Sequence, residues 1–453
     1  MKTRNLFFTF LFVAAAIANV FAQDASVSQN GETRTVTVEQ AVALAMEGNL
    51  GLNRSAITLA ASRRTANTAW NSLLPSVNAS ASTSHPTSPT GTIEPSRVYT
   101  PGGLVEADRD FWTPAVSLGA TLSFSTSIIE NMRAAAIDYE SGRLSYEAAR
   151  ASLELQVRKL FYQVLLADAN SEFAAANFAS AESRYQETAT RAQVGQVPRL
   201  DELSARVDME NFRQTMAEAQ MQYNNILDTF KTVLGLPART QLVLSGDLET
   251  PVSANIRAAV KNSGEPLEVS ILSTSIRSLK AKRNAAIHNA YIPSLTFQWN
   301  NMLSYNIKSE SWSDGTFSIG LGINIANFLP WSNANNGIAA LNDSIRSAEI
   351  ELSQTMRNRD DTLNQNFRTV ETILESMEAT RLNVELAQSS YEMTQEAFRR
   401  GGADYQRLRL ASDSLAQARN RLLQVQYNLA AAVLDIENEL NIPFGTLSKG
   451  EVQ

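Results

Sequence analysis

The stretch VSLGATLSF, residues 116–124, decides the fold class of this 453-residue chain. Its apolar residues alternate with small polar residues or glycine, and the apolar set is Val116, Leu118, Ala120, Leu122 and Phe124. Strict alternation places these side chains on one face of a β-strand. The apolar face of such a strand must meet either a protein core or lipid.

A matching stretch, FSIGLGINI at residues 317–325, lies in the second half of the chain. Its alternating apolar residues are Phe317, Ile319, Leu321, Ile323 and Ile325. In each half an earlier strand follows a helix that ends at a proline, in Leu74-Pro75 and in Ile292-Pro293. The order of helix, strand, loop, strand and long helical region therefore occurs twice, which indicates a tandem duplication.

The long helical regions are too long for a compact domain. No proline lies between Pro114 and Pro198, or between Pro330 and Pro443. A helix over 132–193 would span roughly 90 Å at a rise of about 1.5 Å per residue. Apolar residues in the second half recur at three- and four-residue steps, as in a coiled-coil seam. Glycine-containing breaks at 193–198 and 399–403 predict two antiparallel hairpins with exposed tips.

The N-terminus has the features of a secretory signal peptide. Lys2 and Arg4 precede an apolar run over 6–20, and small residues precede Gln23. We expect residues 1–22 to be removed.

Composition excludes several classes of function. The net charge is −7, there is no cysteine, and only two histidines occur. An acidic chain without a basic aromatic stripe disfavours nucleic-acid binding. No thiolate or histidine cluster suggests a metal or cofactor site, and acidic residues fall on polar helix faces rather than in a convergent group, which argues against an enzyme. No cofactor is expected.

The strand faces favour a membrane. A tilted strand of about nine residues can cross the hydrocarbon core, but spanning strands must close into a barrel because lipid offers no hydrogen-bond partner to an open edge. Four strands cannot close, so copies of the chain would have to associate. Trp112, Trp299 and Trp312 lie near strand ends, where interfacial aromatic residues are favoured. A half-buried strand of a soluble sandwich remains the alternative for a single strand.

The expected organisation has five parts. They are the signal peptide 1–22; a first repeat 23–236, with strands about 76–84 and 114–125 and a hairpin about 132–235; a linker 237–264; a second repeat 265–443, with strands about 294–302 and 316–326 and a hairpin about 338–440; and a tail 444–453.

Over nearly its whole mature length the chain resembles the TolC-type outer-membrane efflux proteins (outer membrane factor family). The resemblance rests on the entry helix TVEQAVALA at 37–45 with Gly48-Asn49, the two strand entries, the duplicated strand pairs and the two tips. It implies a mainly α fold with membrane β-structure, in which a homotrimer forms a twelve-stranded β-barrel in outer-membrane lipid. The barrel would continue into a periplasmic α-helical barrel.

The implied function is an exit duct of a tripartite efflux or type I secretion system. The duct would passively conduct substrates received from a periplasmic adaptor (membrane fusion) protein and an inner-membrane pump or ABC exporter. The resemblance also implies a belt around the middle of the tunnel, formed by the linker, the C-terminal tail and residues 35–38.

The same resemblance assigns roles to the tips. The residues that would dock the adaptor are Val194, Gly195, Val197, Leu200, Asp201, Gly401, Gly402 and Ala403. The candidate gate residues are Asp201, Arg399, Arg400 and Arg407. The chain departs from several members here, because Arg407 and Leu410 stand where those members have acidic residues and Ala403 stands where they have a basic one. Arg399 and Arg400 could instead pair with Asp201 of the neighbouring hairpin.

A different class of protein also fits part of the sequence. A periplasmic or cell-surface coiled-coil protein with a structural or adhesive role would explain the signal peptide and the heptads. It would leave the paired strands of membrane-spanning length unexplained. The cargo cannot be named from the residues, since drug efflux, metal efflux and protein secretion use the same kind of duct.

Overall fold

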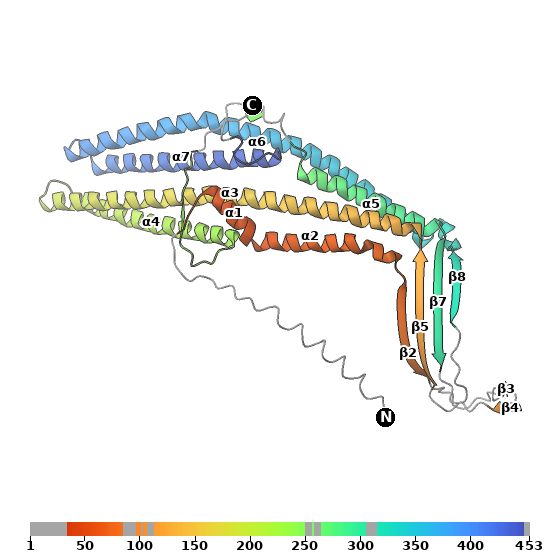
Figure 1. The fold of residues 1–453 in the computed structure, drawn as a ribbon. Coiled ribbons are helices and arrows are strands. Elements are labelled where there is room, and N and C mark those ends of the chain that lie inside the picture. Colours follow the sequence, from red (N-terminus) through yellow and green to blue (C-terminus); the bar gives the residue numbers. More distant parts are fainter. Residues whose placement is uncertain are drawn as a thin grey trace, which may run out of the picture.

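The computed structural model describes residues 34–84, 97–100, 103–106, 113–249, 256–257, 264–304 and 315–447. The predicted signal peptide, Trp112, Trp312 and most of the loops between paired strands lie outside the described residues. Long helices run side by side over most of the molecule, and a narrow sheet extends from one end of them at a steep angle (Figure 1).

Two copies of one structural unit make up the architecture. In each copy a helix leads into two strands, and the second strand leads into a hairpin of two helices. The first copy consists of α2 (Leu50–Thr68), β2 (Ser76–Ser84), β5 (Thr113–Phe124), α3 (Thr126–Gln193) and α4 (Arg199–Leu234). The second consists of α5 (Leu267–Tyr291), β7 (Ser294–Ser304), β8 (Thr316–Gly322), α6 (Asn333–Arg399) and α7 (Tyr405–Glu439). The predicted class, mainly helical with a duplicated strand pair and hairpin, is confirmed.

Shorter elements complete the described structure. They are β1 (Arg34–Val36), α1 (Val38–Gly48), η1 (Ala69–Leu73), β3 (Arg97–Thr100), β4 (Gly103–Glu106), β6 (Leu242–Leu244) and η3 (Ile325–Phe328). Strand β1 pairs in parallel with β6, with Thr35 opposite Val243. The segment that enters the first repeat therefore meets the segment that links the two repeats.

The two longest helices set the dimensions of the molecule. Helix α3 has 68 residues and α6 has 67, so each is roughly 100 Å long. Helix α3 begins at Thr126, earlier than the expected 132, because the Ser125 side chain accepts a hydrogen bond from the backbone N–H of Ser127 and caps the helix directly after β5. Ser332 caps α6 in the same way through the N–H of Asn335, at 3.2 Å.

The helices form a single curved layer with two free lateral edges. Next to the sheet the packing order is α2, α3, α5, α6, and farther away it is α4, α3, α7, α6. Figure 1 shows the same order, with α2 and α4 along one side and α6 along the other. Helix α3 is therefore the central element, and the outer sides of α2, α4 and α6 have no neighbour within the described part of the chain.

Three apolar clusters hold the layer together. The largest surrounds Phe161 and Phe230, whose ring centroids lie 6.2 Å apart, and joins α1, α3 and α4. A second surrounds Phe367 and Ile436 between α6 and α7. A third lies at the hairpin tips around Phe398. Each cluster is small because a layer one helix thick has little interior.

Candidate functional site

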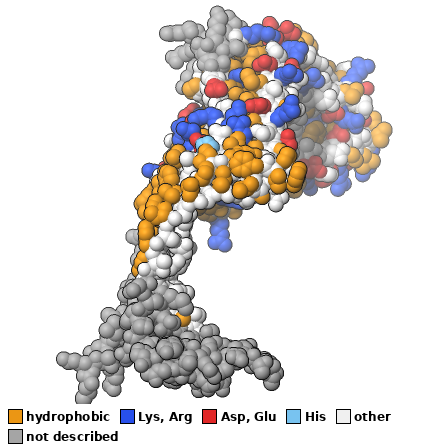
Figure 2. Space-filling view, turned by 90° about the vertical axis from the view of Figure 1, so that its right-hand side faces the viewer, with side chains coloured by type: hydrophobic (Ala, Val, Ile, Leu, Met, Phe, Trp, Pro, Cys, Tyr) orange, Lys and Arg blue, Asp and Glu red, His pale blue; other side chains and the backbone are white. Residues whose placement is uncertain are grey.

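The four-stranded sheet has one apolar and one polar face. Its strand order is β2, β5, β7, β8, and all neighbours are antiparallel. Residues directly opposite each other in paired strands point to the same side. Leu122 is opposite Phe297, which is opposite Ile319, so the apolar positions of successive strands share one face. Figure 2 shows hydrophobic side chains gathered along one side of the sheet.

The apolar face is largely uncovered. Exposed fractions reach 50% for Val116, 63% for Phe317 and 75% for Leu321. The residues predicted to face lipid that lie on this face are Val116, Leu118, Leu122, Phe124, Phe317, Ile319 and Leu321. Within the described part of the chain nothing packs over them.

The last two residues predicted for the lipid-facing strand, Ile323 and Ile325, lie beyond it. Strand β8 ends at Gly322 rather than near 326. The last pair of the β7–β8 ladder is Ser294–Gly322. The ladder ends there because the residue before Ser294 is Pro293, which has no backbone N–H to donate to β8. The Asn324 side chain then accepts a hydrogen bond from the N–H of Ala326 and starts η3. Both isoleucines are nevertheless exposed.

The opposite face of the sheet carries small and polar side chains. The hydroxyl oxygens of Ser80 and Ser117 lie 2.6 Å apart across β2 and β5. A Cβ on Gly119 would lie 2.8 Å from Oδ1 of Asn300, so this position accepts no larger residue without a shift of that side chain. This face can contact water but offers no convergent acid, base or metal ligand.

The two hairpin tips have the same backbone geometry. Gly195 and Gly401 end α3 and α6 with φ of 76° and 78°, in the left-handed region that glycine enters without strain. The residue after each glycine donates its N–H back to the preceding helix, from Gln196 to the Arg191 carbonyl and from Gly402 to the Ala397 carbonyl. The predicted breaks are therefore tight helix ends.

The predicted tip residues divide into exposed and packed groups. Val194 is 66% exposed and Leu200 is 71% exposed, whereas Ala403 packs against the tip cluster. Gly195, Gly401 and Gly402 are exposed, and Val197 and Asp201 are half-buried. Exposed apolar side chains at a loop tip favour contact with another protein.

The candidate gate residues are not joined to one another within the described part of the chain. Arg400 pairs with Glu396 of its own helix at 2.7 Å. The backbone carbonyl oxygen of Arg399 accepts a hydrogen bond from the Arg191 side chain. The backbone N–H of Arg407 donates to the Asp404 carboxylate, which caps α7. No ion pair links Asp201 to Arg399 or Arg400 among these residues.

A different arginine joins the two tips. The Arg191 guanidinium donates to the Phe398 carbonyl at 3.2 Å and to the Arg399 carbonyl at 3.0 Å. It also lies 5.4 Å from the centre of the Phe398 ring and pairs with Glu187 at 2.9 Å. Arg191 was missed in the sequence because nothing in its helical neighbourhood distinguishes it from other exposed arginines. Its only local signal is its position in the last turn of α3.

A buried polar cluster lies next to this contact. The Tyr405 hydroxyl donates to the Asp208 carboxylate at 2.9 Å, and Asp208 also faces Arg409 at 3.6 Å. Arg184 donates to the Tyr391 hydroxyl at 3.3 Å. Burial and the Asp208 carboxylate raise the pKa of the Tyr405 phenol, so it remains a hydrogen-bond donor. This cluster ties α4 of the first hairpin to α7 of the second.

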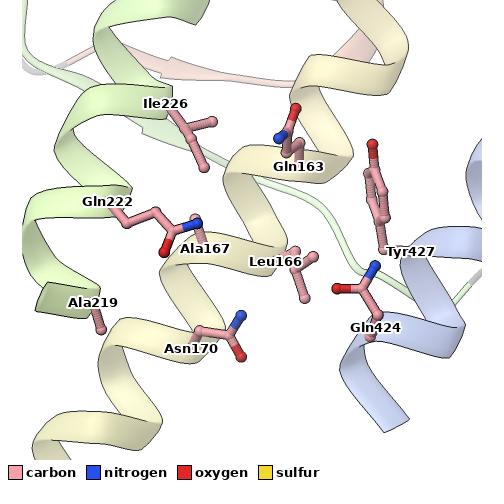
Figure 3. A pocket seen from close by; sticks show the side chains of 9 residues that line it. All are labelled: Gln163, Leu166, Ala167, Asn170, Ala219, Gln222, Ile226, Gln424 and Tyr427. Carbon is pink, nitrogen blue, oxygen red and sulfur yellow. The ribbon is translucent and has the colours of Figure 1, made fainter. Parts of the chain in front are cut away.

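A polar cavity of about 200 Å³ lies between α3, α4 and α7, far from the tips. Figure 3 shows side chains from all three helices pointing toward it. Those with a carboxamide or hydroxyl group are Gln163, Asn170, Gln222, Gln424 and Tyr427. The Oδ1 atom of Asn170 is buried without a partner. The lining contains no carboxylate, histidine, lysine or arginine side chain.

The residues that the structure describes contain no group of three or more His, Cys, Asp or Glu side chains placed to hold a metal ion. No helix among them is both long and apolar enough to cross a bilayer.

Comparison with known proteins agrees with this geometry. Residues 41–236 match the family described as "Outer membrane efflux protein". No curated protein matches the sequence. The fold is similar to that of the CmeC outer membrane channel of Campylobacter jejuni, with a TM-score of 0.73 and 17% identity, covering 91% of this chain and 87% of that one.

Two other channels show the same likeness. For VceC of Vibrio cholerae the TM-score is 0.71 at 12% identity, covering 90% of this chain and 96% of that one. For the open state of MtrE of Neisseria gonorrhoeae it is 0.70 at 15% identity, covering 89% of each chain. At such identities the likeness shows the fold. Residues 41–236 are therefore similar to the outer membrane efflux protein family, and the whole chain has the fold of these outer-membrane channels.

Proposed function

We propose that the duct is a homotrimer whose three four-stranded sheets close into a twelve-stranded barrel. The observation that carries this proposal is a sheet with one exposed apolar face and two edges, β2 and β8, that pair with no other described strand. In lipid an unpaired edge leaves backbone groups without partners, and about eight strands are the fewest that close. The up-and-down order of the sheet allows β8 of one copy to pair antiparallel with β2 of the next. The number three is what the resemblance to the family implies.

In this assembly the apolar face contacts lipid and the polar face lines the pore. The helices continue the barrel as a tunnel in the periplasm. Substrates pass through without chemistry, as the resemblance to the family implies.

The tips are the proposed docking site for a periplasmic adaptor protein, which links the duct to an inner-membrane pump or ABC exporter. Exposed apolar residues on the first tip, Val194, Leu200 and Leu203, support this role. The second tip adds an open groove of about 630 Å³ beside Met393, Arg400 and Gly402. An adaptor helix with matching apolar residues could bury both surfaces.

The same tips carry the proposed gate. Asp201, Arg399, Arg400 and Arg407 lie close to the point where the hairpins end, and Arg191 holds the two hairpins together there. If Asp201 and Arg400 hold the closed state, Asp201→Ala and Arg400→Ala each raise single-channel conductance in planar bilayers. Unchanged conductance in both variants would remove these two residues from the gate.

Extraction and mass measurement test the assembly. A barrel stays in the membrane after salt or urea washing and is released by detergent as particles of about three times the mass of one chain, by light scattering. Release by urea alone would favour the coiled-coil structural protein instead. That alternative is opposed by the exposed apolar face of the sheet, which a soluble scaffold would have to cover.

A further inference from the structure

The connection between the second strand and the long helix differs between the two repeats. In the first repeat β5 ends at Phe124 and α3 begins at Thr126, so a single residue joins them. In the second repeat β8 ends at Gly322 and α6 begins at Asn333, so the connection consists of residues 323–332 and includes η3. We call residues 323–332 the η3 segment. The duplicated architecture does not require its extra length, and its composition indicates what it contacts.

The η3 segment is apolar, uncharged and exposed. No ionisable side chain occurs anywhere in residues 316–342. Exposed fractions are 76% for Ile325, 55% for Phe328 and 73% for Trp331, and Ile323 and Leu329 are exposed as well. So many large apolar side chains in one short segment are unfavourable in water, and such a patch usually marks a contact with a membrane or another protein.

The backbone of the η3 segment is fixed against the rest of the protein. Nδ2 of Asn335 donates to the carbonyl oxygens of Asn327 at 3.1 Å and Leu329 at 2.7 Å. Nδ2 of Asn327 donates to a carbonyl oxygen in the last turn of α5 at 3.2 Å. The rings of Tyr291 and Phe328 lie 5.4 Å apart, edge to face. Irregular backbone can lie beside lipid only when its polar groups are satisfied in this way.

The η3 segment lies where the proposed barrel leaves the membrane. Strand β7, which pairs with β8, has 11 residues and is roughly 36 Å long at about 3.3 Å per residue. With a tilt of about 40° it rises roughly 28 Å, close to the apolar band of about 25 Å in membrane barrels. Residues directly after β8 therefore reach the boundary between acyl chains and headgroups, where tryptophan is favoured.

The exposed surface of the η3 segment continues the apolar face of the sheet. Leu321 lies on that face, and Ile323 is the next residue in the alternation. Figure 2 shows hydrophobic side chains along one side of the sheet and onward over the adjoining end of the helical region. A second copy could also cover this surface, because η1 at the other edge of the sheet exposes Trp70. Continuity with the apolar face and the lack of charge favour lipid.

We infer that the η3 segment anchors the protein at the membrane surface, with Ile325, Phe328 and Trp331 inserted among the headgroups and upper acyl chains of phospholipids. This inference rests on the proposed barrel, whose outer face the segment extends. The indole N–H of Trp331 can donate to a lipid oxygen while its ring contacts acyl chains. The anchor sets the depth of the barrel, because movement along the membrane normal would expose these side chains to water or bury the indole N–H.

A fluorophore on a single introduced cysteine tests contact with lipid, and the chain has no cysteine of its own. The labelled variants are Ile325→Cys and Trp331→Cys in the η3 segment, Ile319→Cys on the apolar face of the sheet, and Met356→Cys on α6. All four side chains are exposed, and Met356 lies roughly 35 Å along α6 from its first residue. The full-length protein is inserted into vesicles of phosphatidylethanolamine and phosphatidylglycerol that carry a nitroxide at the headgroup or at the chain end.

The headgroup nitroxide should quench the labels of Ile325→Cys and Trp331→Cys at least several-fold more strongly than the label of Met356→Cys. The chain-end nitroxide should quench Ile319→Cys best, because that position lies deeper. If Ile319→Cys is quenched but the η3 segment is not, the anchor is overturned and the proposed barrel stands. If Ile319→Cys is quenched no more than Met356→Cys, the lipid contact of the sheet fails, and the proposed barrel with it.

Emission typical of apolar surroundings without quenching in the η3 segment would show that a second copy covers it, which also overturns the anchor. The conservative variant Trp331→Phe gives a readout that needs no label. In vesicles whose acyl chains are brominated near the headgroup, this variant should lose part of the tryptophan fluorescence that bromine quenches in the wild type. Equal quenched fluorescence in the two proteins would place Trp331 away from lipid and overturn the anchor.

Discussion

Gly48 and Gly235 lie backbone against backbone where α1 meets the end of α4. A Cβ on Gly48 would lie 2.6 Å from the Leu234 carbonyl oxygen, and a Cβ on Gly235 would overlap the Gly48 carbonyl. The Asn49 side chain secures the contact by donating to the Val233 carbonyl at 2.9 Å. It also accepts from the N–H of Leu52 at 3.0 Å and so caps α2.

Gly235→Ala should destabilise the protein by about 2–4 kcal/mol, because the new methyl group collides with backbone and φ is +73°. The matched control is Gly337→Ala in α6, where a Cβ has open space, and it should be neutral or stabilise by about 0.5–1 kcal/mol. Thermal unfolding followed by circular dichroism distinguishes the two. Equal unfolding midpoints for the Gly235→Ala and Gly337→Ala variants would show that the contact between Gly48 and Gly235 accommodates a methyl group without loss of stability.

Arg191→Ala should raise single-channel conductance, because it removes both hydrogen bonds and the ring contact that hold the tip of α3 to Phe398. Arg213→Ala is the control: Arg213 lies over Phe178 at 5.6 Å and pairs with Glu210, all within the first hairpin. Its loss should leave conductance unchanged. An equal effect of both variants would point to general loosening of the hairpin.

Tyr405→Phe should lower the free energy of unfolding by about 1–3 kcal/mol, because it leaves the buried Asp208 carboxylate without its hydroxyl donor. Tyr427→Phe serves as the control, since the Tyr427 hydroxyl lines the polar cavity and makes no hydrogen bond to a described residue. The measurement is the shift in unfolding midpoint of each variant. An unchanged unfolding midpoint for Tyr405→Phe would mean that a water molecule replaces the hydroxyl as the donor to Asp208.

Glu437 should make stability depend on pH. Its carboxylate is 1% exposed and accepts the N–H of Gly445 at 2.9 Å and of Leu447 at 2.8 Å. Burial raises its pKa above the ordinary value, more than these hydrogen bonds lower it. The folded state then binds the proton more tightly than the unfolded state, so the contribution is greatest below the unfolded pKa and is lost as pH rises through the folded pKa.

Glu437→Gln tests this dependence. Glutamine is neutral throughout, so the wild type should lose stability relative to the variant as the pH rises above the ordinary glutamate pKa of about 4.3. Unfolding midpoints at several pH values give the difference. A difference that does not change with pH, or one of opposite sign, would show that Glu437 is ionised at no cost.

Much of the architecture follows from local patterns in the sequence. The alternation at Val116–Phe124 determined a strand with one apolar face, because side chains on a strand point to opposite sides in turn. The long stretches without proline determined the helix lengths, and Gly195 and Gly401 determined where the helices end. The end of β8 was placed too late because Ile323 and Ile325 continue the alternation after Pro293 has ended the ladder.

Only the tertiary structure decided which distant residues meet. Arg191 and Phe398, Asp208 and Tyr405, and Gly48 and Gly235 are each far apart in the chain, and no local pattern distinguishes them from similar residues elsewhere. The spacing of apolar residues within a segment indicates which side of that helix or strand is apolar, because the spacing depends only on the geometry of the helix or strand itself. A contact between two elements depends on how they pack, and that packing is fixed by the whole layer of helices at once.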